Sequence, residues 1–168
     1  MRRRTFLAAG IAGAATLTVA GWWAAMRRPV ERVDVLNDDA RAILTAIVPS
    51  MLDGALPASP RERSAAIAET VANVDRAIQG LPPAARQEIG QLFSLLSLTP
   101  ARRAFAGVAS PWADATVDEI AAFLEAWRSS GWTLKRSAYD ALHQLILAAW
   151  YGNPRSWRDI GYPGPPRI

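Results

Sequence analysis

The sequence predicts an all-α fold, a small bundle of about five helices that follows an N-terminal signal or anchor helix. Apolar side chains recur at positions i, i+3, i+4 and i+7 in successive segments, as they do on one face of a helix. No stretch alternates apolar and polar residues convincingly enough to indicate a strand. Because short connections containing Gly and Pro separate the helical segments, we expect neighbouring helices to run mostly antiparallel.

The first two helices of the body have recognisable start and stop signals. Asn37 is typical of an N-cap, and we expect Pro49 to end or kink the helix that follows it. The second helix begins after Ser59, with proline in its first position, and we expect Gly80 to end it in the left-handed conformation. The apolar stripes are Ala40, Ile43, Leu44 and Ile47 in the first helix and Ile67, Val71, Val74 and Ile78 in the second.

Three further helices are predicted, and a shorter turn separates the first of them from the other two. Thr116 and Glu119 have the spacing of a capping box, in which each side chain bonds the backbone amide of the other residue. We expect Gly131 to stop the helix that this box begins, and we expect the last helix to be the longest. The predicted ranges are 84–98, 116–131 and 133–151.

The tail that follows differs in kind from the body. Residues 153–157 suggest a single capped turn, and three prolines between residues 159 and 166 exclude a helix or a central strand. We therefore expect an extended C-terminal tail, packed either on its own bundle or on a partner. The chain then has three parts, which are a leader at 1–28, a helical bundle domain at 29–152 and the tail at 153–168.

The leader carries the pattern of an export signal. Arg3 and Arg4 are followed, after one spacer residue, by Phe6 and Leu7, and then by an apolar run without charge as far as Met26. This pattern resembles the signal of the twin-arginine (Tat) pathway, which exports folded proteins. We therefore expect the protein to meet the Tat translocon and to work in the periplasm or on the periplasmic face of the inner membrane.

The apolar run permits two fates for the leader. A helix over residues 6–26 would be roughly 32 Å long, enough to span a hydrocarbon core of about 30 Å. Ala and Gly dominate the run, however, and Thr18 and Ala20 occupy the −3 and −1 positions of an acceptable cleavage site. Composition therefore favours a cleaved leader, and attachment to the membrane through an uncleaved helix is the alternative.

Charge and cysteine content exclude several classes of function. The net charge of +4 belongs to the leader, because residues 29–168 carry 14 basic and 15 acidic side chains. A nucleic-acid partner is therefore not expected, since such partners are bound by a basic face. Cysteine is absent, which excludes disulfides, covalent haem attachment through Cys-x-x-Cys-His and thiolate-bound iron–sulfur clusters.

The body shows no catalytic constellation. His143, the one histidine, has Tyr139 and Asp140 about one turn before it, and a lone histidine is more often structural than a base or a metal ligand. Neither a Gly-rich nucleotide loop nor a Gly-x-Ser-x-Gly motif is present. We therefore expect no catalytic, cofactor-binding or metal-binding residue in this chain. The alternative is a small enzyme whose site contains these three residues.

The end of the chain carries its most specific pattern. Residues 150–157 read Trp-Tyr-Gly-Asn-Pro-Arg-Ser-Trp, and residues 160–164 read Ile-Gly-Tyr-Pro-Gly. With the Tat leader, the helical body and the Ala-Ile-Val-Pro that ends the first helix, this pattern resembles the gluconate 2-dehydrogenase subunit 3 family. The resemblance implies a non-catalytic small subunit that supplies the export signal for a large flavoprotein of the glucose-methanol-choline (GMC) type. The large subunit would hold FAD, and a cytochrome c subunit often accompanies such pairs.

We expect the tail to contact this large subunit. Trp157 and Tyr162 lie among arginines and prolines and suit an interface, whereas Trp127 and Trp150 lie on apolar stripes and suit the core. A stand-alone, membrane-anchored periplasmic helical protein with a structural or binding role is the alternative function. The predicted partner-binding residues are Asn153, Pro154, Arg155, Trp157, Gly161, Tyr162 and Pro163.

Overall fold

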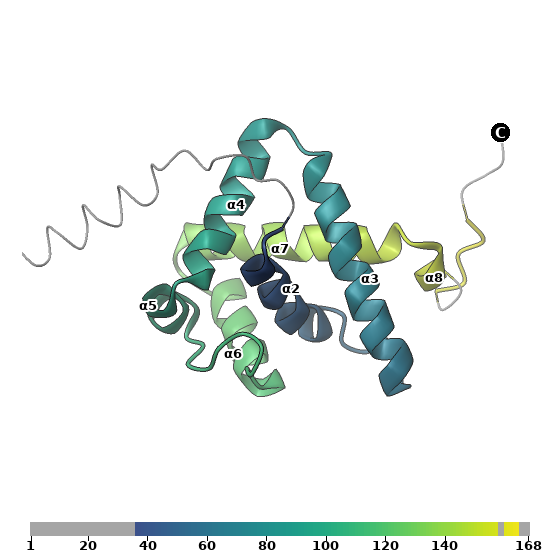
Figure 1. Ribbon diagram of the computed structural model, residues 1–168, viewed down its shortest axis with the longest axis horizontal. Helices are drawn as coiled ribbons and strands as arrows, with labels where there is room; N and C mark the ends of the chain where they lie inside the picture. Colours follow the sequence, from purple (N-terminus) through teal and green to yellow (C-terminus); the bar gives the residue numbers. More distant parts are fainter. Residues whose placement is uncertain (1–35, 158–159, 165–168) are drawn as a thin grey trace, which may run out of the picture. The chain divides into compact units, whose positions relative to one another are not determined.

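The computed structural model of the protein describes residues 36–157 and 160–164. This part of the chain contains seven α-helices, one π-helical turn and no strand, which confirms the predicted all-α class (Figure 1). Five of the helices have between 12 and 20 residues, in agreement with the predicted number. The elements are α2 (Asp38–Met51), α3 (Pro60–Gln79), α4 (Pro83–Ser97), α5 (Thr99–Ala101), the π-helical turn η1 (Arg102–Ala106), α6 (Val117–Arg128), α7 (Thr133–Tyr151) and α8 (Pro154–Trp157).

The first helix of the described body, α2, lies at the centre of the bundle. It packs against α3, α4, α6 and α7, and in Figure 1 α7 runs across the bundle behind α3. Its predicted apolar stripe is buried, with Ile43, Leu44 and Ile47 wholly removed from solvent. Complete burial of one such side chain contributes roughly 2 kcal/mol. The periodicity in the sequence therefore identified the buried face of this helix.

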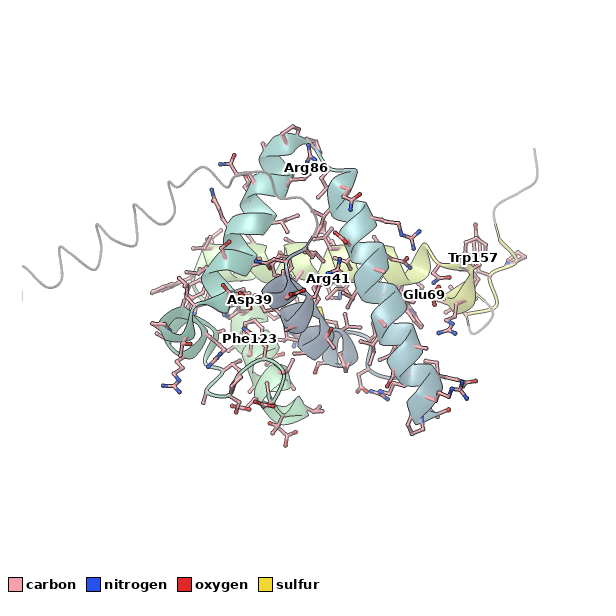
Figure 2. All side chains as sticks on the ribbon, viewed as in Figure 1. Asp39, Arg41, Glu69, Arg86, Phe123 and Trp157 are labelled. Carbon is pink, nitrogen blue, oxygen red and sulfur yellow. The ribbon has the colours of Figure 1, made fainter. Side chains whose placement is uncertain are left out.

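Aromatic side chains form a second part of the core, around α6. Trp127 and Trp150 are buried, as predicted, and Trp112 is buried as well. Trp127 packs edge-on against Phe123 and Phe105, with ring centroids 4.8 and 5.1 Å away, and its indole N–H donates to the Phe105 carbonyl over 3.1 Å. Such edge-to-face pairs add to the hydrophobic burial. Figure 2 labels Phe123, which belongs to this group of aromatic side chains.

Pro49 does not end α2, which was one of the two outcomes expected for it; the proline lies inside the helix. The helix continues to Met51, and the backbone N–H of Leu52 donates to the Val48 carbonyl over 2.9 Å. Val48 and Leu52 on either side of the proline are buried in the core. Burial of these two side chains therefore outweighs the hydrogen bond that proline removes.

Two glycines do not act as the predicted helix stops. Gly80 caps α3 with φ −76°, not in the left-handed region, and the two prolines that follow account for the break because they cannot continue the helix. α6 ends at Arg128, where the hydroxyl of Ser129 donates to the Glu125 carbonyl, before Gly131 is reached. The glycine that does end an element left-handed is Gly107, at φ +77° after η1. α3, with 20 residues, is also one residue longer than α7.

The predicted capping box at the start of α6 is present. The Glu119 amide donates to the Thr116 hydroxyl and the Thr116 amide donates to the Glu119 carboxylate, each over 3.2 Å. The amide and hydroxyl of Ser110 also donate to Glu119. The Thr116 amide first, and then Ser110, stabilise the carboxylate and hold the pKa of Glu119 below its ordinary value of 4.5. Glu119 therefore fixes both the helix start and the loop before it.

The beginning of the described chain is held to α3 by three residues, which we name the N-terminal clamp: Leu36, Arg41 and Asp75. The buried Asp75 carboxylate accepts the Leu36 amide at 3.2 Å and an Arg41 guanidinium N–H at 2.9 Å. The Arg41 Nε donates to the Leu36 carbonyl over 3.0 Å, and Figure 2 shows Arg41 between α2 and α3. The clamp fixes where the chain enters the body.

Candidate interaction site at the C-terminal end

The predicted export-signal residues Arg3, Arg4, Phe6 and Leu7 lie outside the described residues. No helix of the described part is long and apolar enough to cross a membrane. The proposed boundary at residue 28 also lies outside it. The leader therefore stays a sequence-based prediction, and the site that can be built from the structure is the C-terminal segment.

The start of the predicted tail is a folded turn. Asn153 behaves as a cap, because its side-chain oxygen accepts the Arg155 amide at 3.0 Å, and the single helical turn α8 follows. The buried hydroxyl of Ser156 donates to the carbonyls of Trp150 and Asn153, each over 2.9 Å. The predicted capped turn is thus confirmed. The hydroxyl of Ser156 ties it to the end of α7.

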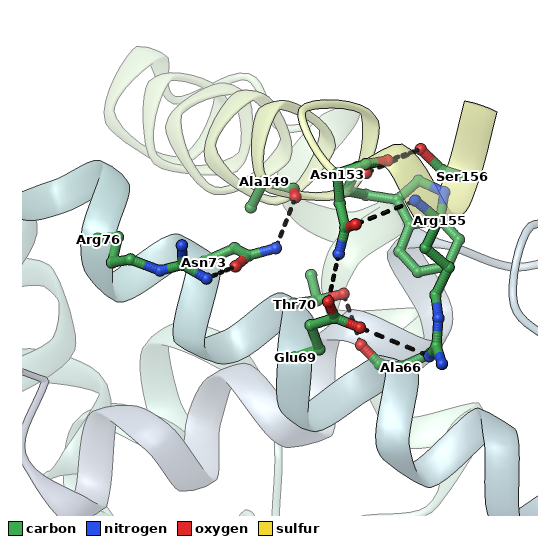
Figure 3. A network of polar contacts seen from close by, with 10 residues as sticks. Ala66, Glu69, Thr70, Asn73, Arg76, Ala149, Asn153, Arg155 and Ser156 are labelled. Carbon is green, nitrogen blue, oxygen red and sulfur yellow. Dashed lines mark hydrogen bonds and ion pairs between the residues drawn. The ribbon is translucent and has the colours of Figure 1, made fainter. Parts of the chain in front are cut away.

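A small polar network also ties the tail to α3 (Figure 3). The side-chain amide of Asn153 donates to Glu69 over 2.7 Å, and the Arg155 guanidinium lies 3.6 Å from the other oxygen of the same carboxylate. One turn further along α3, the side-chain amide of Asn73 donates to the Ala149 carbonyl over 3.3 Å. Two of the predicted partner-binding residues, Asn153 and Arg155, therefore direct their polar groups to α3. In this arrangement they position the tail.

The last described residues fold back onto Trp157. Its indole N–H donates to the Tyr151 carbonyl over 2.7 Å, and its own carbonyl accepts the Tyr162 amide at 2.9 Å. The two rings meet edge-on with centroids 5.3 Å apart. The backbone of Gly164 passes so close that a Cβ there would lie 3.1 Å from the Trp157 ring. Residues 160–164 thus turn back onto Trp157 and form neither helix nor strand, as the prolines predicted.

Four large side chains at this end form what we name the C-terminal aromatic cluster: Tyr151, Trp157, Ile160 and Tyr162. Trp157 is half-buried, and the other three are between 41 and 56 % exposed. Pro154, Gly161 and Pro163, which were predicted as partner-binding residues, are exposed beside it. The result is an exposed apolar surface on a segment held by hydrogen bonds, a combination typical of interface anchors.

The predicted partner-binding residues include neither Tyr151 nor Ile160, although Ile160 lies within the tail that was expected to contact the partner. Tyr151 is the last residue of α7 and directly follows the inward-facing Trp150, so a helical wheel already places it off the apolar stripe. Ile160 lies in a turn and has no helical stripe to join. In both cases the signal is a large apolar residue that the core pattern does not use.

The alternative catalytic residues lie on α7. The rings of Tyr139 and His143 stack with centroids 5.6 Å apart and an interplanar angle of 19°. Asp140 is exposed on the same helix. Within residues 36–157 and 160–164, no three side chains of His, Cys, Asp or Glu gather to form a metal site. The stack is a contact between neighbours on one helix, and it gives no specific support to a catalytic role.

These features define a helical protein whose C-terminal segment presents aromatic side chains from a fixed position. Comparison of the chain with protein-family models, with curated proteins and with solved structures finds no match. The arrangement in itself is suited to contact another macromolecule, because it presents exposed aromatic side chains from a fixed position.

Proposed function

We propose that this chain is the non-catalytic small subunit of an exported, FAD-dependent dehydrogenase of the GMC type. In this proposal the chain supplies the Tat signal for the large subunit, stabilises it and stays bound to it in the periplasm. The observation that carries the proposal is the C-terminal aromatic cluster, exposed on the segment whose sequence resembles the subunit 3 family.

The fixed position of the cluster supports a docking role. A tail that is already ordered loses less conformational entropy on binding than a free tail does. Asn153 and Arg155 hold the segment to Glu69, and Ser156 holds it to α7. The cluster has a half-buried Trp and two exposed Tyr side chains, and these are residue types that dominate interface energies.

The export signal supports the same assignment by a separate argument. Tat carries folded proteins, so a Tat signal on a helical protein without an evident cofactor site is useful if it serves a bound, folded partner. A flavoprotein folded around FAD is such a partner. The division of roles places FAD and the catalytic residues in the large subunit, and electrons from it would pass to a cytochrome c subunit where one is present.

The test is recovery of the partner from the native host. An affinity tag inserted in the exposed turn at Asp53–Gly54 leaves both chain ends free. We expect the tagged full chain to retain a larger protein that contains FAD, in a ratio near one to one. Recovery of the chain alone, folded and monodisperse, would favour the stand-alone periplasmic protein instead.

Matched variants locate the contact. Tyr162→Ala removes an exposed ring from the C-terminal aromatic cluster, and an interface anchor of this type is worth about 2 kcal/mol, or roughly thirtyfold in affinity. Trp132→Ala is the control, because Trp132 is a more exposed aromatic residue at the other end of α7. Equal recovery of the flavoprotein by Tyr162→Ala and by the wild type would exclude the cluster as the docking surface.

A further inference from the structure

A second exposed apolar surface lies at the beginning of α7. Leu98, Trp132 and Leu134 are 51, 67 and 58 % exposed. Since α7 has 19 residues, its two ends are about 28 Å apart, so this surface is separate from the C-terminal aromatic cluster. Large apolar side chains that are this exposed indicate an interaction surface for a partner or a membrane.

The Lys135 side chain contacts aromatic rings from two segments of the chain at the beginning of α7. Its ammonium group lies 5.0 Å from the centre of the Phe105 ring in η1 and 5.7 Å from the centre of the Trp132 ring. Leu98 caps α5, the turn that leads into η1, and its carbonyl accepts the Arg102 amide at 2.8 Å. Figure 1 shows α5 near the beginning of α7. We name this surface the basic aromatic surface; its residues are Leu98, Arg103, Phe105, Trp132, Leu134 and Lys135.

The two segments that build this surface are the most basic part of the described chain. Residues 98–106 and 128–136 hold five basic side chains and no acidic one, whereas the remaining described residues hold six basic and twelve acidic side chains. Arg128 pairs with Glu125 over 2.8 Å. The other four cations have no carboxylate partner within the described residues, but Arg102 is buried, so Arg103 and Lys135 are the cations that this surface presents. The surface therefore offers positive charge to an outside anion.

From this combination we propose that the basic aromatic surface docks on an anionic phospholipid membrane. A membrane-contacting face of a protein typically has Trp at the headgroup level, Leu toward the acyl chains and Lys or Arg beside the phosphates. Nucleic acid would also attract the cations, but the exposed leucines gain nothing from a phosphodiester backbone. The acidic remainder of the body would be repelled by the same lipids, which orients the protein with this surface toward the membrane.

The number of residues after the apolar run bears on whether an uncleaved leader would allow this contact. Nine residues, 27–35, separate the apolar run from Leu36, and nine residues reach at most about 30 Å. An apolar run held in the membrane would thus keep the body within reach of the lipid headgroups. The inference is independent of the proposed dehydrogenase partner, because it concerns the other end of α7.

The absence of cysteine gives a direct test. Leu134→Cys in the full chain creates a unique thiol for an environment-sensitive fluorophore, and Glu62→Cys on the exposed start of α3 is the matched control. Vesicles of phosphatidylcholine alone and of equal parts phosphatidylcholine and phosphatidylglycerol are added to each labelled protein. Because every variant keeps residues 1–35, any binding through the leader is common to all of them.

We expect the probe at position 134 to enter an apolar environment with the anionic vesicles alone, while the probe at position 62 stays in water. Lys135→Glu should lower the ratio of lipid-buried to water-exposed probe at least about fivefold. The exposed control Arg61→Glu should leave this ratio unchanged, and thermal unfolding checks that each variant is folded. The proposal is overturned if position 134 stays in water, if both probes respond alike, or if position 134 responds to polyuridylate RNA and not to vesicles.

Discussion

Removal of the Asp75 carboxylate tests whether the N-terminal clamp stabilises the body. In Asp75→Ala the Leu36 amide, which is buried and accepted by Asp75 at 3.2 Å, loses its acceptor. An orphaned buried donor costs about 2 kcal/mol. The Arg41 side chain is 39 % exposed and keeps its bond to the Leu36 carbonyl, so loss of its ion pair adds about 1 kcal/mol.

The helix propensity of alanine opposes part of this loss. Alanine is more favourable than aspartate within a helix by about 0.5 kcal/mol, which leaves a net destabilisation of about 2.5 kcal/mol. For a body of this size the midpoint of thermal unfolding should fall by about 8 °C. Asp75→Asn keeps an oxygen for the Leu36 amide and loses the charge, so it should cost about 1 kcal/mol.

The assay is urea unfolding of the full chain followed by circular dichroism, with the exposed Asp53→Ala as control. A double-mutant cycle with Arg41→Ala isolates the ion pair from the amide bond. If Asp75→Ala and Asp53→Ala differ by less than about 0.5 kcal/mol, the clamp contributes no stability and the reasoning from burial is wrong.

Three further predictions concern the residues around α6. Because the pKa of Glu119 is lowered in the fold, its contribution is present above pH 4.5 and is lost as the pH falls through its folded pKa; Glu119→Gln should therefore weaken the acid dependence of unfolding, as measured by urea titrations from pH 7 to pH 3. Gly107→Ala, at φ +77°, should cost about 1 kcal/mol, while Gly131→Ala, outside the left-handed region and in open space, should change the unfolding midpoint little. Trp127→Phe removes the indole bond to Phe105 and should cost about 2 kcal/mol in the same assay.

The sequence was most informative where helical periodicity and caps agree. The stripe of α2, the Asn37 cap and the capping box at Thr116 and Glu119 are all present as predicted. These signals are local, because each depends on residues within one or two turns of one another. The all-α class and the number of long helices follow from them.

Tertiary packing decided what local signals could not. Pro49 stays within a helix because Val48 and Leu52 are buried on both sides of it, and no local rule reports that burial. The contact of Asp75 with Leu36 spans 39 residues. Such pairs have no signature in a single sequence, so neither the clamp nor the continuation of α2 past Pro49 could be predicted.

The candidate site was predicted in part for the same reason. The tail motif predicted Trp157 and Tyr162 as interface residues, and these two rings do contact each other at an exposed end of the body. The link from Asn153 to Glu69 spans 84 residues and was not visible. Trp132 resembles the other tryptophans in sequence, and its high exposure emerges only from the arrangement of α6, η1 and α7.

α3 holds both ends of the described body. Asp75 binds the first described residue, and Glu69, six positions earlier on the same helix, binds the tail at Asn153 and Arg155. The two attachment points are about 9 Å apart along the helix axis. Chain ends usually fray independently of the core, whereas here a fluctuation that melts α3 releases both ends at once. Amide hydrogen exchange at Leu36 and Arg155 should therefore follow the opening of α3, so that the start and the end of the body behave as one cooperative unit.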